Sequence, residues 1–306
     1  MGSVDPAAVP DQAGRRGRAD ESTYRLLVLP FLAVLFLLVA APIISAFGIS
    51  LSSLNLTKLT SPEFVGLENY QLLLRDPRFW NDIGVWLSLV FGATVLQLGL
   101  GLALALALTG EGRFVRFCRA AFILPMVLPE VVVGLVWKLL LMPTYGGLNQ
   151  ALRALAVPEI PWLTASSLAL PTVTGVVVWE WTPFVILLLV ASLQSLPQEP
   201  FEAAQVDGAN TWQVFRHITL PLLSPAILFV AIFRIIESLK VFPVIYVLTG
   251  GGPGTTTEPI NYYAYLLGFS YSRVGEAATV IVMIFLFVLV MSLFMIAWRA
   301  NPAEGA

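Results

Sequence analysis

Residues 202–210 read EAAQVDGAN and residues 218–221 read ITLP, in a polar segment between two long apolar ones. Pro200 suits the first turn of a helix, because the N–H that proline lacks has no partner there. Glu202 favours the positive N-terminal end of the same helix. Gly208 is typical of a helix stop, since glycine readily adopts the left-handed conformation that ends many helices. The segment therefore predicts a short helix that ends at this glycine.

A second short helix is expected directly after Gly208. Asn210 and Gln213 have the spacing of a capping box, in which each side chain satisfies a backbone amide near the other residue. Ala203 and Ala204 leave the first helix without bulk, so another protein could approach its backbone closely. On propensity alone, however, a connecting loop that happens to be helical is the favoured interpretation.

Long apolar stretches dominate the rest of the chain. Hydrophobic residues make up 58% of the 306 positions and charged residues 12%, whereas a soluble domain carries about 25% charged residues. About 20 apolar residues in a helix cross a membrane core of roughly 30 Å. The stretches are Leu26–Phe47, Ile83–Thr109, Ala120–Met142, one within Thr164–Leu196, Leu220–Leu248 and Ala277–Trp298. The sequence thus predicts an all-α membrane protein with six transmembrane helices.

The loop charges predict how these helices are oriented. With the N-terminus in the cytoplasm, the inner segments carry nine Lys/Arg residues and the outer segments five, in agreement with the usual positive excess inside. The nine are Arg15, Arg16, Arg18, Arg25, Arg113, Arg116, Arg119, Arg216 and Arg299; the five are Lys58, Arg75, Arg78, Arg153 and Arg273. Both termini are therefore expected in the cytoplasm, with residues 1–25 a disordered tail and residues 299–306 a C-terminal tail. Residues 26–78 are expected to hold the first helix and a periplasmic loop, and residues 79–298 the other five helices.

Composition and motifs exclude several classes of protein. The formal net charge of −2 gives no basic surplus for binding nucleic acid. Cys118 is the only cysteine and His217 the only histidine, so neither an intrachain disulfide framework nor a Cys/His metal site is expected. The sequence has no Ser/Lys, His-Glu-x-x-His or paired-Asp hydrolase motif, and we expect no catalytic residue.

Charged side chains interrupt three of the apolar stretches, and such residues mark a cavity, an ion pair or a functional site. Arg234, Glu237 and Lys240 have the spacing i, i+3, i+6, so neighbouring members can pair along one side of a helix. Glu130 and Glu180, in the third and fourth stretches, could face the same interior. Substrate contact and an ion-pair network between helices are both open for these residues.

The segment over residues 202–221 resembles a family signature. Glu-Ala-Ala at residues 202–204, three residues, Gly208, nine residues and then Ile218-x-Leu220-Pro221 is similar to the motif of the permease subunits of binding-protein-dependent ABC importers. In that family the segment is the coupling helix, which fits a cleft on the ATPase subunit. The resemblance covers roughly Phe79 to Trp298 and implies a type I ABC importer transmembrane domain, with its coupling helix over about 197–209. The residues that it implies as ATPase contacts are Glu202, Ala203, Ala204, Asp207 and Gly208.

A second block resembles a narrower group. Lys240-Val241-Phe242, followed by Thr249–Gly254 with the sequence TGGGPG, is similar to the maltose-permease-F type of carbohydrate importer, which includes glycerol-phosphate and trehalose importers. Relatives often have an acidic residue after the Lys-x-Phe element, where this chain has Pro243, so no role of that carboxylate carries over. The substrate implied is a sugar, disaccharide, polyol or sugar derivative, which these motifs do not distinguish.

The resemblance also implies a complex in the bacterial cytoplasmic (inner) membrane, surrounded by membrane lipid. This chain would be the F-like half of a heterodimer with a G-like second permease subunit. Two copies of an ATP-binding subunit and a periplasmic or lipid-anchored solute-binding protein would complete the complex. The ATP-binding subunits would bind ATP and Mg, and this chain would bind no cofactor or metal.

A pathway for a polyhydroxylated substrate would combine carboxylates with aromatic faces. Trp179-Glu180-Trp181 has that combination, although aromatic residues in membrane helices more often serve packing. The candidate pathway residues are Glu130, Trp137, Glu180, Trp181, Arg234, Glu237, Lys240 and Tyr246.

Two alternatives concern other kinds of function. A secondary, proton-coupled transporter could use Glu130, Glu180 or Glu237 as a proton relay, but it would not need the segment that ends at Gly208. Thr249–Gly254 is rich in glycine but lacks the Gly-Lys-Ser/Thr ending of a phosphate-binding loop. A flexible turn on the outer side is the favoured interpretation of that loop.

Overall fold

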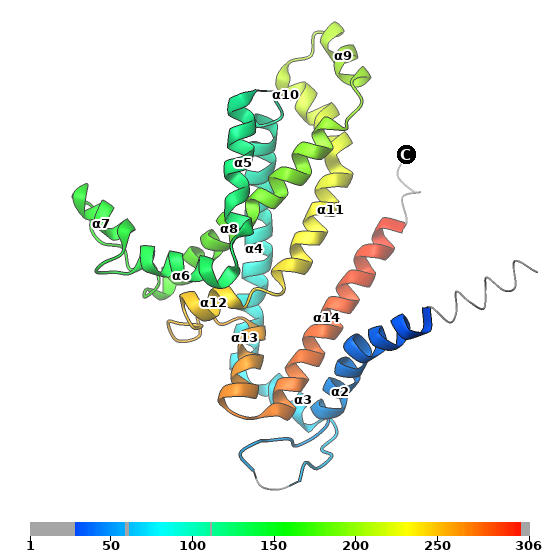
Figure 1. Cartoon of the computed structure of the whole chain (residues 1–306), viewed down its shortest axis with the longest axis vertical. Helices are drawn as coiled ribbons and strands as arrows, with labels where there is room; N and C mark the ends of the chain where they lie inside the picture. The colour runs from blue at the N-terminus through cyan, green and yellow to red at the C-terminus, as the bar shows by residue number, and fades with distance from the viewer. Residues whose placement is uncertain (1–27, 59–60, 111, 301–306) are drawn as a thin grey trace, which may run out of the picture.

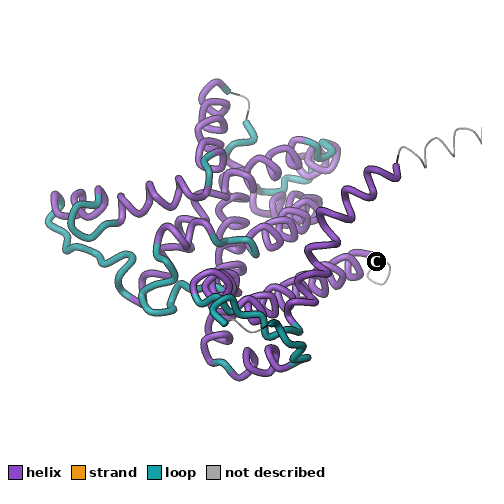
Figure 2. Tube along the Cα trace, turned by 60° about the horizontal axis from the view of Figure 1, so that its bottom comes forward, coloured by secondary structure: helices purple, strands orange, loops and turns teal. Residues whose placement is uncertain are grey.

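The computed structural model of the chain describes residues 28–58, 61–110 and 112–300, and these form helices joined by loops (Figures 1 and 2). The expected tails therefore lie almost wholly outside the described residues. The α-helices are α2 (Ala41–Ser50), α3 (Glu68–Arg75), α4 (Pro77–Ala107), α5 (Arg113–Val127), α6 (Glu130–Leu141), α7 (Gly147–Ala154), α8 (Ser166–Gln194), α9 (Glu199–Val206), α10 (Thr211–Val214), α11 (Leu220–Ser238), α12 (Pro243–Leu248), α13 (Ile260–Tyr265) and α14 (Val274–Ala300). Three π-helical turns interrupt them: η1 (Phe36–Ala40), η2 (Phe215–Thr219) and η3 (Leu266–Ser270).

Five helical segments in the described residues are long and apolar enough to cross a membrane. They are Val28–Ser50, Pro77–Ala107, Ser166–Gln194, Thr211–Ser238 and Val274–Leu293. A sixth span is present if α5 and α6 together count as one. The predicted all-α, multi-pass architecture is confirmed, and α4, α8 and α14 lie close to their expected positions.

Two of the predicted spans are not continuous helices. Ala120–Met142 is divided between α5 and α6, whose axes differ by 98°, because Pro129 holds the preceding Leu128 in an extended conformation (ψ 138°). Leu220–Leu248 is divided between α11 and α12. Pro243 is the first residue of α12, where its missing N–H does least harm. The pattern of apolar residues alone does not separate one long helix from two shorter ones.

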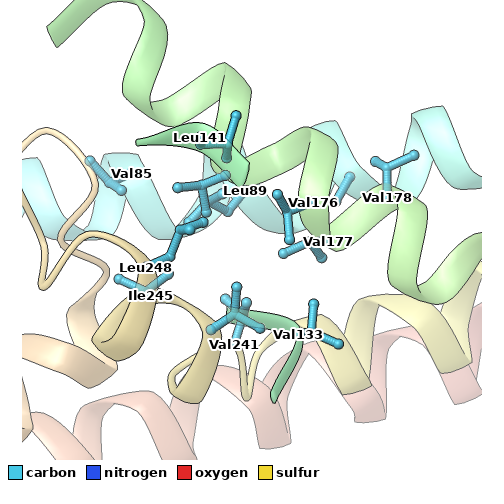
Figure 3. Packing of buried hydrophobic residues seen from close by; sticks show 13 residues of the cluster. Val85, Leu89, Val133, Leu141, Val176, Val177, Val178, Val241, Ile245 and Leu248 are labelled. Atoms are coloured by element: carbon cyan, nitrogen blue, oxygen red, sulfur yellow. The ribbon is translucent and has the colours of Figure 1, made fainter. Parts of the chain in front are cut away.

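The centre of the fold is the contact between α4 and α8. Gly101 on α4 permits this contact, since a Cβ there would lie only 2.5 Å from Cγ1 of Val185 on α8. Figure 3 shows the hydrophobic cluster beside it, to which Val85 and Leu89 of α4 and Val177 of α8 contribute. The divided helices return to the same cluster, because α6 supplies Val133 and Leu141 and α12 supplies Val244, Ile245 and Leu248.

The molecule has two distinct ends, which we name the α9 end and the α3 end (Figure 1). Helix α9 projects beyond the ends of α4, α5 and α8 at the first. Helix α3, the loop segments over residues 51–58 and 61–65 and the turn before α14 lie at the second. Helix α2 packs against α14 near the α3 end, and the two diverge toward the α9 end.

Candidate functional site

The α9 end presents a short helix with a mostly exposed surface. Glu202, Ala203 and Gln205 are exposed, and the side chain of Val206 is 88% exposed. Ala204 is the exception, since only 7% of it is exposed and it faces the body of the chain. The predicted contact set is therefore divided: Ala204 supports α9 from within, while its neighbours remain available to another molecule.

The end of α9 has the predicted local geometry. Gly208 lies in the left-handed region with φ +74°, and its N–H donates to the carbonyl of Gln205 at 3.2 Å. Asn210 and Gln213 form the expected capping box, with N–O distances of 2.9 and 2.8 Å. A cavity of about 370 Å³ lies beside this turn, lined by Asp207, Gly208, Ala209, Gln213, Val214, His217 and Ile218.

Arg234 lies inside the bundle, where it connects three helices. Its Nε donates to Oε1 of Gln97 on α4 at 2.9 Å, and one terminal nitrogen donates to Oγ of Ser238 at 3.2 Å. Gln97 in turn donates to the carbonyl of Val177 on α8 at 3.1 Å. The guanidinium carbon lies 4.5 Å from the ring centroid of Trp181. With 1% of Arg234 exposed, this side chain is a structural connection between α4, α8 and α11.

Three carboxylates surround this arginine without direct contact. Glu130, Glu180 and Glu237 all lie within electrostatic range of Arg234, but in the described part of the chain none approaches it within 4.0 Å. Glu180 is 2% exposed, and its Oε2 has no hydrogen-bond partner among the described residues. Glu130 and Glu180 thus lie near the same buried arginine, whereas the side chain of Glu237 is partly exposed.

Glu237 and Lys240 lie at the end of α11 and face outward. Lys240 Nζ donates to Glu237 Oε1 at 2.9 Å, and their side chains are 69% and 27% exposed. The prediction that neighbouring charges pair along the helix is confirmed for these two residues and wrong for Arg234, which turns the other way. Because α11 ends at Ser238, the three charges lie at a helix end rather than in the middle of a 29-residue span.

The aromatic candidates separate into two groups. Trp137 and Trp179 pack edge to face with centroids 5.4 Å apart, and Trp181 lies against Arg234. Tyr246 on α12 belongs elsewhere, beside the aromatic rings of α13. Sequence reasoning missed Gln97 as a site residue. Its signal was present, since an amide within the uncharged stretch Ile83–Thr109 needs a partner.

The glycine-rich loop after α12 is held in place, contrary to the expected flexible turn. Glu258, at its end, accepts two hydrogen bonds from Arg78 of α4, at 2.6 and 2.9 Å. Asn81 donates to the carbonyl of Thr255 at 3.2 Å, and Thr257 Oγ1 donates to Oγ1 of Thr249 at 2.8 Å. These bonds attach the loop to the first turns of α4 at the α3 end.

Known proteins match this chain over most of its length. Residues 97–301 match the family described as "Binding-protein-dependent transport system inner membrane component". The Trehalose/maltose transport system permease protein MalF of Thermococcus litoralis is 37% identical over 253 residues, covering 82% of this chain and 83% of that protein. The Sulfoquinovosyl glycerol transport system permease protein SmoG of Agrobacterium fabrum is 34% identical over 264 residues, covering 85% and 84%.

A solved structure has the same fold. It is a bacterial ABC transporter involved in the import of the acidic polysaccharide alginate, and one of its chains matches with a TM-score of 0.81 at 23% identity. The match covers 96% of this chain and 100% of that one. The predicted type I ABC importer transmembrane fold is thereby confirmed. With the family match over residues 97–301 and two relatives above 30% identity, the chain belongs to the binding-protein-dependent transport system inner membrane components.

Proposed function

We propose that this chain is the transmembrane permease subunit of an ATP-driven importer that moves a carbohydrate across the bacterial cytoplasmic membrane. Family membership supports the transport role. The names of two relatives, one for trehalose and maltose and one for sulfoquinovosyl glycerol, support a carbohydrate as the substrate. The substrate would pass the exposed Lys240 and the partly exposed Glu237 rather than the enclosed Arg234.

The exposed surface of α9 supports a coupling role, and this is the observation that carries the mechanism. A helix with small and acidic side chains at its surface, projecting from one end of the bundle (Figure 1), suits a cleft on an ATP-binding partner. Glu202, Ala203, Asp207 and Gly208 would make the contact. Two ATP-binding subunits would bind and hydrolyse ATP with Mg, and this chain would bind no cofactor.

Beyond the turn that ends α9, the route into the membrane is one continuous helical segment. Thr211–Ser238 is one helical segment of 28 residues, about 42 Å long at 1.5 Å per residue. It begins three residues after Gly208 and contains Arg234 near its far end. A displacement of α9 would therefore move α11 as a rigid body against α4 and α8, which is one way that packed helices switch between two states.

The remaining parts of the complex follow from the same proposal. A second, G-like permease subunit would complete the pathway, and a periplasmic or lipid-anchored solute-binding protein would deliver the carbohydrate at the α3 end. The α9 end and both termini would then lie in the cytoplasm. Such a subunit is a transport component without a catalytic residue of its own.

A pair of alanine substitutions tests the coupling role in the complete complex. Ala203→Tyr adds bulk to the exposed face of α9, and Ala154→Tyr adds the same bulk to an exposed alanine at the end of α7. We expect Ala203→Tyr to lower receptor-stimulated ATPase activity and uptake at least about tenfold, or about 1.4 kcal/mol, at normal purification yield. Ala154→Tyr should leave both near wild type. Normal coupling in Ala203→Tyr would refute the assignment.

A proton-coupled transporter is the second candidate, favoured by one observation. Glu180 is enclosed in the bundle with an unpartnered oxygen among the described residues, as a proton relay would require. Uptake into vesicles separates the two functions. The importer requires ATP and the solute-binding protein and continues after a protonophore is added, whereas the proton-coupled transporter stops with the protonophore and ignores ATP.

A further inference from the structure

Five aromatic rings form a continuous cluster from α12 to η3, which we name the aromatic file: Phe242, Tyr246, Tyr262, Tyr265 and Phe269. Consecutive rings are close, with centroids 5.7 Å apart for Phe242 and Tyr246 and 5.6 Å for Tyr246 and Tyr265. Tyr265 and Phe269 stack at 5.2 Å with an angle of 27° between their planes. The rings therefore offer several adjacent faces of similar chemistry.

Packing between helices does not use all of this aromatic surface. Tyr262 is buried, with 7% exposed, and has an ordinary core position. Tyr246 is 48% exposed and Phe269 is 80% exposed. Leucine would be sufficient for packing between membrane helices at these positions. Two large aromatic rings that remain exposed therefore indicate that their faces have another role.

The file connects two parts of the proposed transport pathway. Phe269 lies in η3, which belongs to the turn before α14 at the α3 end (Figure 1). Phe242 lies two residues after Lys240, whose exposed ammonium pairs with Glu237. Asn261, between the two ends, is anchored to the carbonyl of Val241 at 3.2 Å. Asn261 is already engaged, since its Oδ1 also accepts from the N–H of Tyr262, so the exposed Lys240 is the group that could bind hydroxyls at this end of the file.

We propose that the aromatic file is a binding track for the pyranose or furanose rings of the substrate, leading from the α3 end to Glu237 and Lys240. This inference rests on the proposed function as a carbohydrate importer. It assigns a substrate with at least one closed sugar ring, and it assigns the positions Tyr246, Tyr265 and Phe269 to substrate contact.

The chemistry of a sugar ring matches such a track. One face of the ring presents polarised C–H bonds, which are attracted to the negative face of an aromatic ring. The hydroxyls around the edge can bond to the phenol groups of Tyr246 and Tyr265 and to the charges beyond Phe242. Passage also needs several weak sites rather than one strong site, because a ligand must leave each position as readily as it enters. Neighbouring rings of similar type meet that condition.

The test compares two double variants of the complete complex in vesicles, with ATP hydrolysis and uptake measured together. Tyr246→Leu with Phe269→Leu removes two rings of the track. Tyr145→Leu with Phe91→Leu removes two rings of matching exposure (80% and 47%) that belong to no ring pair among the described residues. The probes are a panel of labelled mono-, di- and trisaccharides, and the acyclic polyol sorbitol.

We expect the track variant to lower the amount of sugar carried per ATP about tenfold, equivalent to about 1.4 kcal/mol, because two ring contacts are lost. Receptor-stimulated ATPase activity, yield and melting temperature should stay near wild type, and the control variant should transport normally. An unchanged ratio of sugar to ATP would overturn the track. So would a parallel fall in yield and melting temperature, which indicates packing, or loss of the second permease subunit, which indicates an interface.

Transport by the wild-type complex distinguishes failure of the track from failure of the proposed carbohydrate import, through three possible results. Import of ringed sugars by the wild type with no effect of the track variant refutes the track alone. Import of sorbitol but of no ringed sugar refutes the track and keeps the importer. If the wild type imports nothing from the panel, the proposed carbohydrate function fails and the track fails with it.

Discussion

Single residues near the end of α11 have opposite roles although they are six positions apart. Arg234 is enclosed between Gln97, Ser238 and Trp181, whereas Lys240 is exposed and pairs with Glu237. An enclosed guanidinium with hydrogen bonds on two helices stabilises their contact. An exposed i, i+3 pair contributes little, about 1 kcal/mol at most.

Arg234→Gln should therefore destabilise the complex, while Glu237→Gln should not. We expect Arg234→Gln to lower the free energy of unfolding by about 3 kcal/mol, through lost hydrogen bonds and an unfilled space. Glu237→Gln should keep yield and melting temperature near wild type but lower uptake, because in the proposed pathway Glu237 would accept hydrogen bonds from substrate hydroxyls. Thermal unfolding in detergent and uptake in vesicles measure the two effects. A melting temperature that falls in Glu237→Gln would remove that residue from the pathway.

Gly208 allows bulk and charge to be tested at the coupling contact without an internal clash. No heavy atom lies within 4 Å of the position that a Cβ would occupy. Aspartate and asparagine tolerate the left-handed conformation better than other residues, so the folding cost should be about 1 kcal/mol. We expect Gly208→Asp to insert normally and to lose most of its ATPase coupling, with Gly208→Asn as the uncharged control of equal strain. Normal uptake by the Asp variant would be evidence against the contact.

At the scale of elements, the loop after α12 depends on α4. Arg78→Gln would leave Glu258, whose side chain is 4% exposed, without its cation. We expect amide exchange over residues 249–257 to speed up about tenfold, since the loop would lose its attachment. Arg75→Gln changes an exposed arginine three residues earlier and should have no effect. Mass-spectrometric hydrogen exchange measures both, and equal protection in the two variants would contradict the attachment.

Local signals in the sequence were sufficient for much of the architecture. The helix stop at Gly208 and the capping box at Asn210 depend on residues only a few positions apart, and both are confirmed. The interruptions before α6 and α12 were also readable, since Pro129 and Pro243 restrict the backbone wherever they stand. A count of apolar residues alone does not register the helix interruptions that those prolines cause.

Contacts between distant residues could not be predicted in the same way. Arg234 and Gln97 are 137 positions apart, and Arg78 and Glu258 are 180 apart. Their pairing depends on how α4 packs against α8 and α11 and on where the loop after α12 returns. For the same reason the sequence could group Arg234 with Glu237 and Lys240 by spacing, but could not show that the arginine turns inward.

At the scale of the whole molecule, the proposed orientation can be measured with two serines of opposite location. Ser61 lies in the loop region at the α3 end and Ser195 follows α8 toward the α9 end, and both are exposed. In a Cys118→Ser background, we expect Ser61→Cys to react with an impermeant maleimide in intact spheroplasts. Ser195→Cys should react only after the membrane is opened. Labelling of both from one side would exclude the proposed topology.

The π turn η2 lies within the helical segment that leads from the turn after α9 into the membrane, and it has a consequence for angular phase. A π turn accommodates one residue more than an α-helical turn, and each residue advances a helix by about 100°. The Oγ1 of Thr219 fits this geometry, since it donates a hydrogen bond to the carbonyl of Val214, five residues earlier, at 3.4 Å. Deleting one residue from η2 would convert it to α-helix and rotate everything beyond it, so that Arg234 would no longer point at Gln97. The extra residue thus sets the direction around the helix axis in which Arg234 points. A rotation of α9 that is transmitted along the helix would act on Arg234 in that orientation.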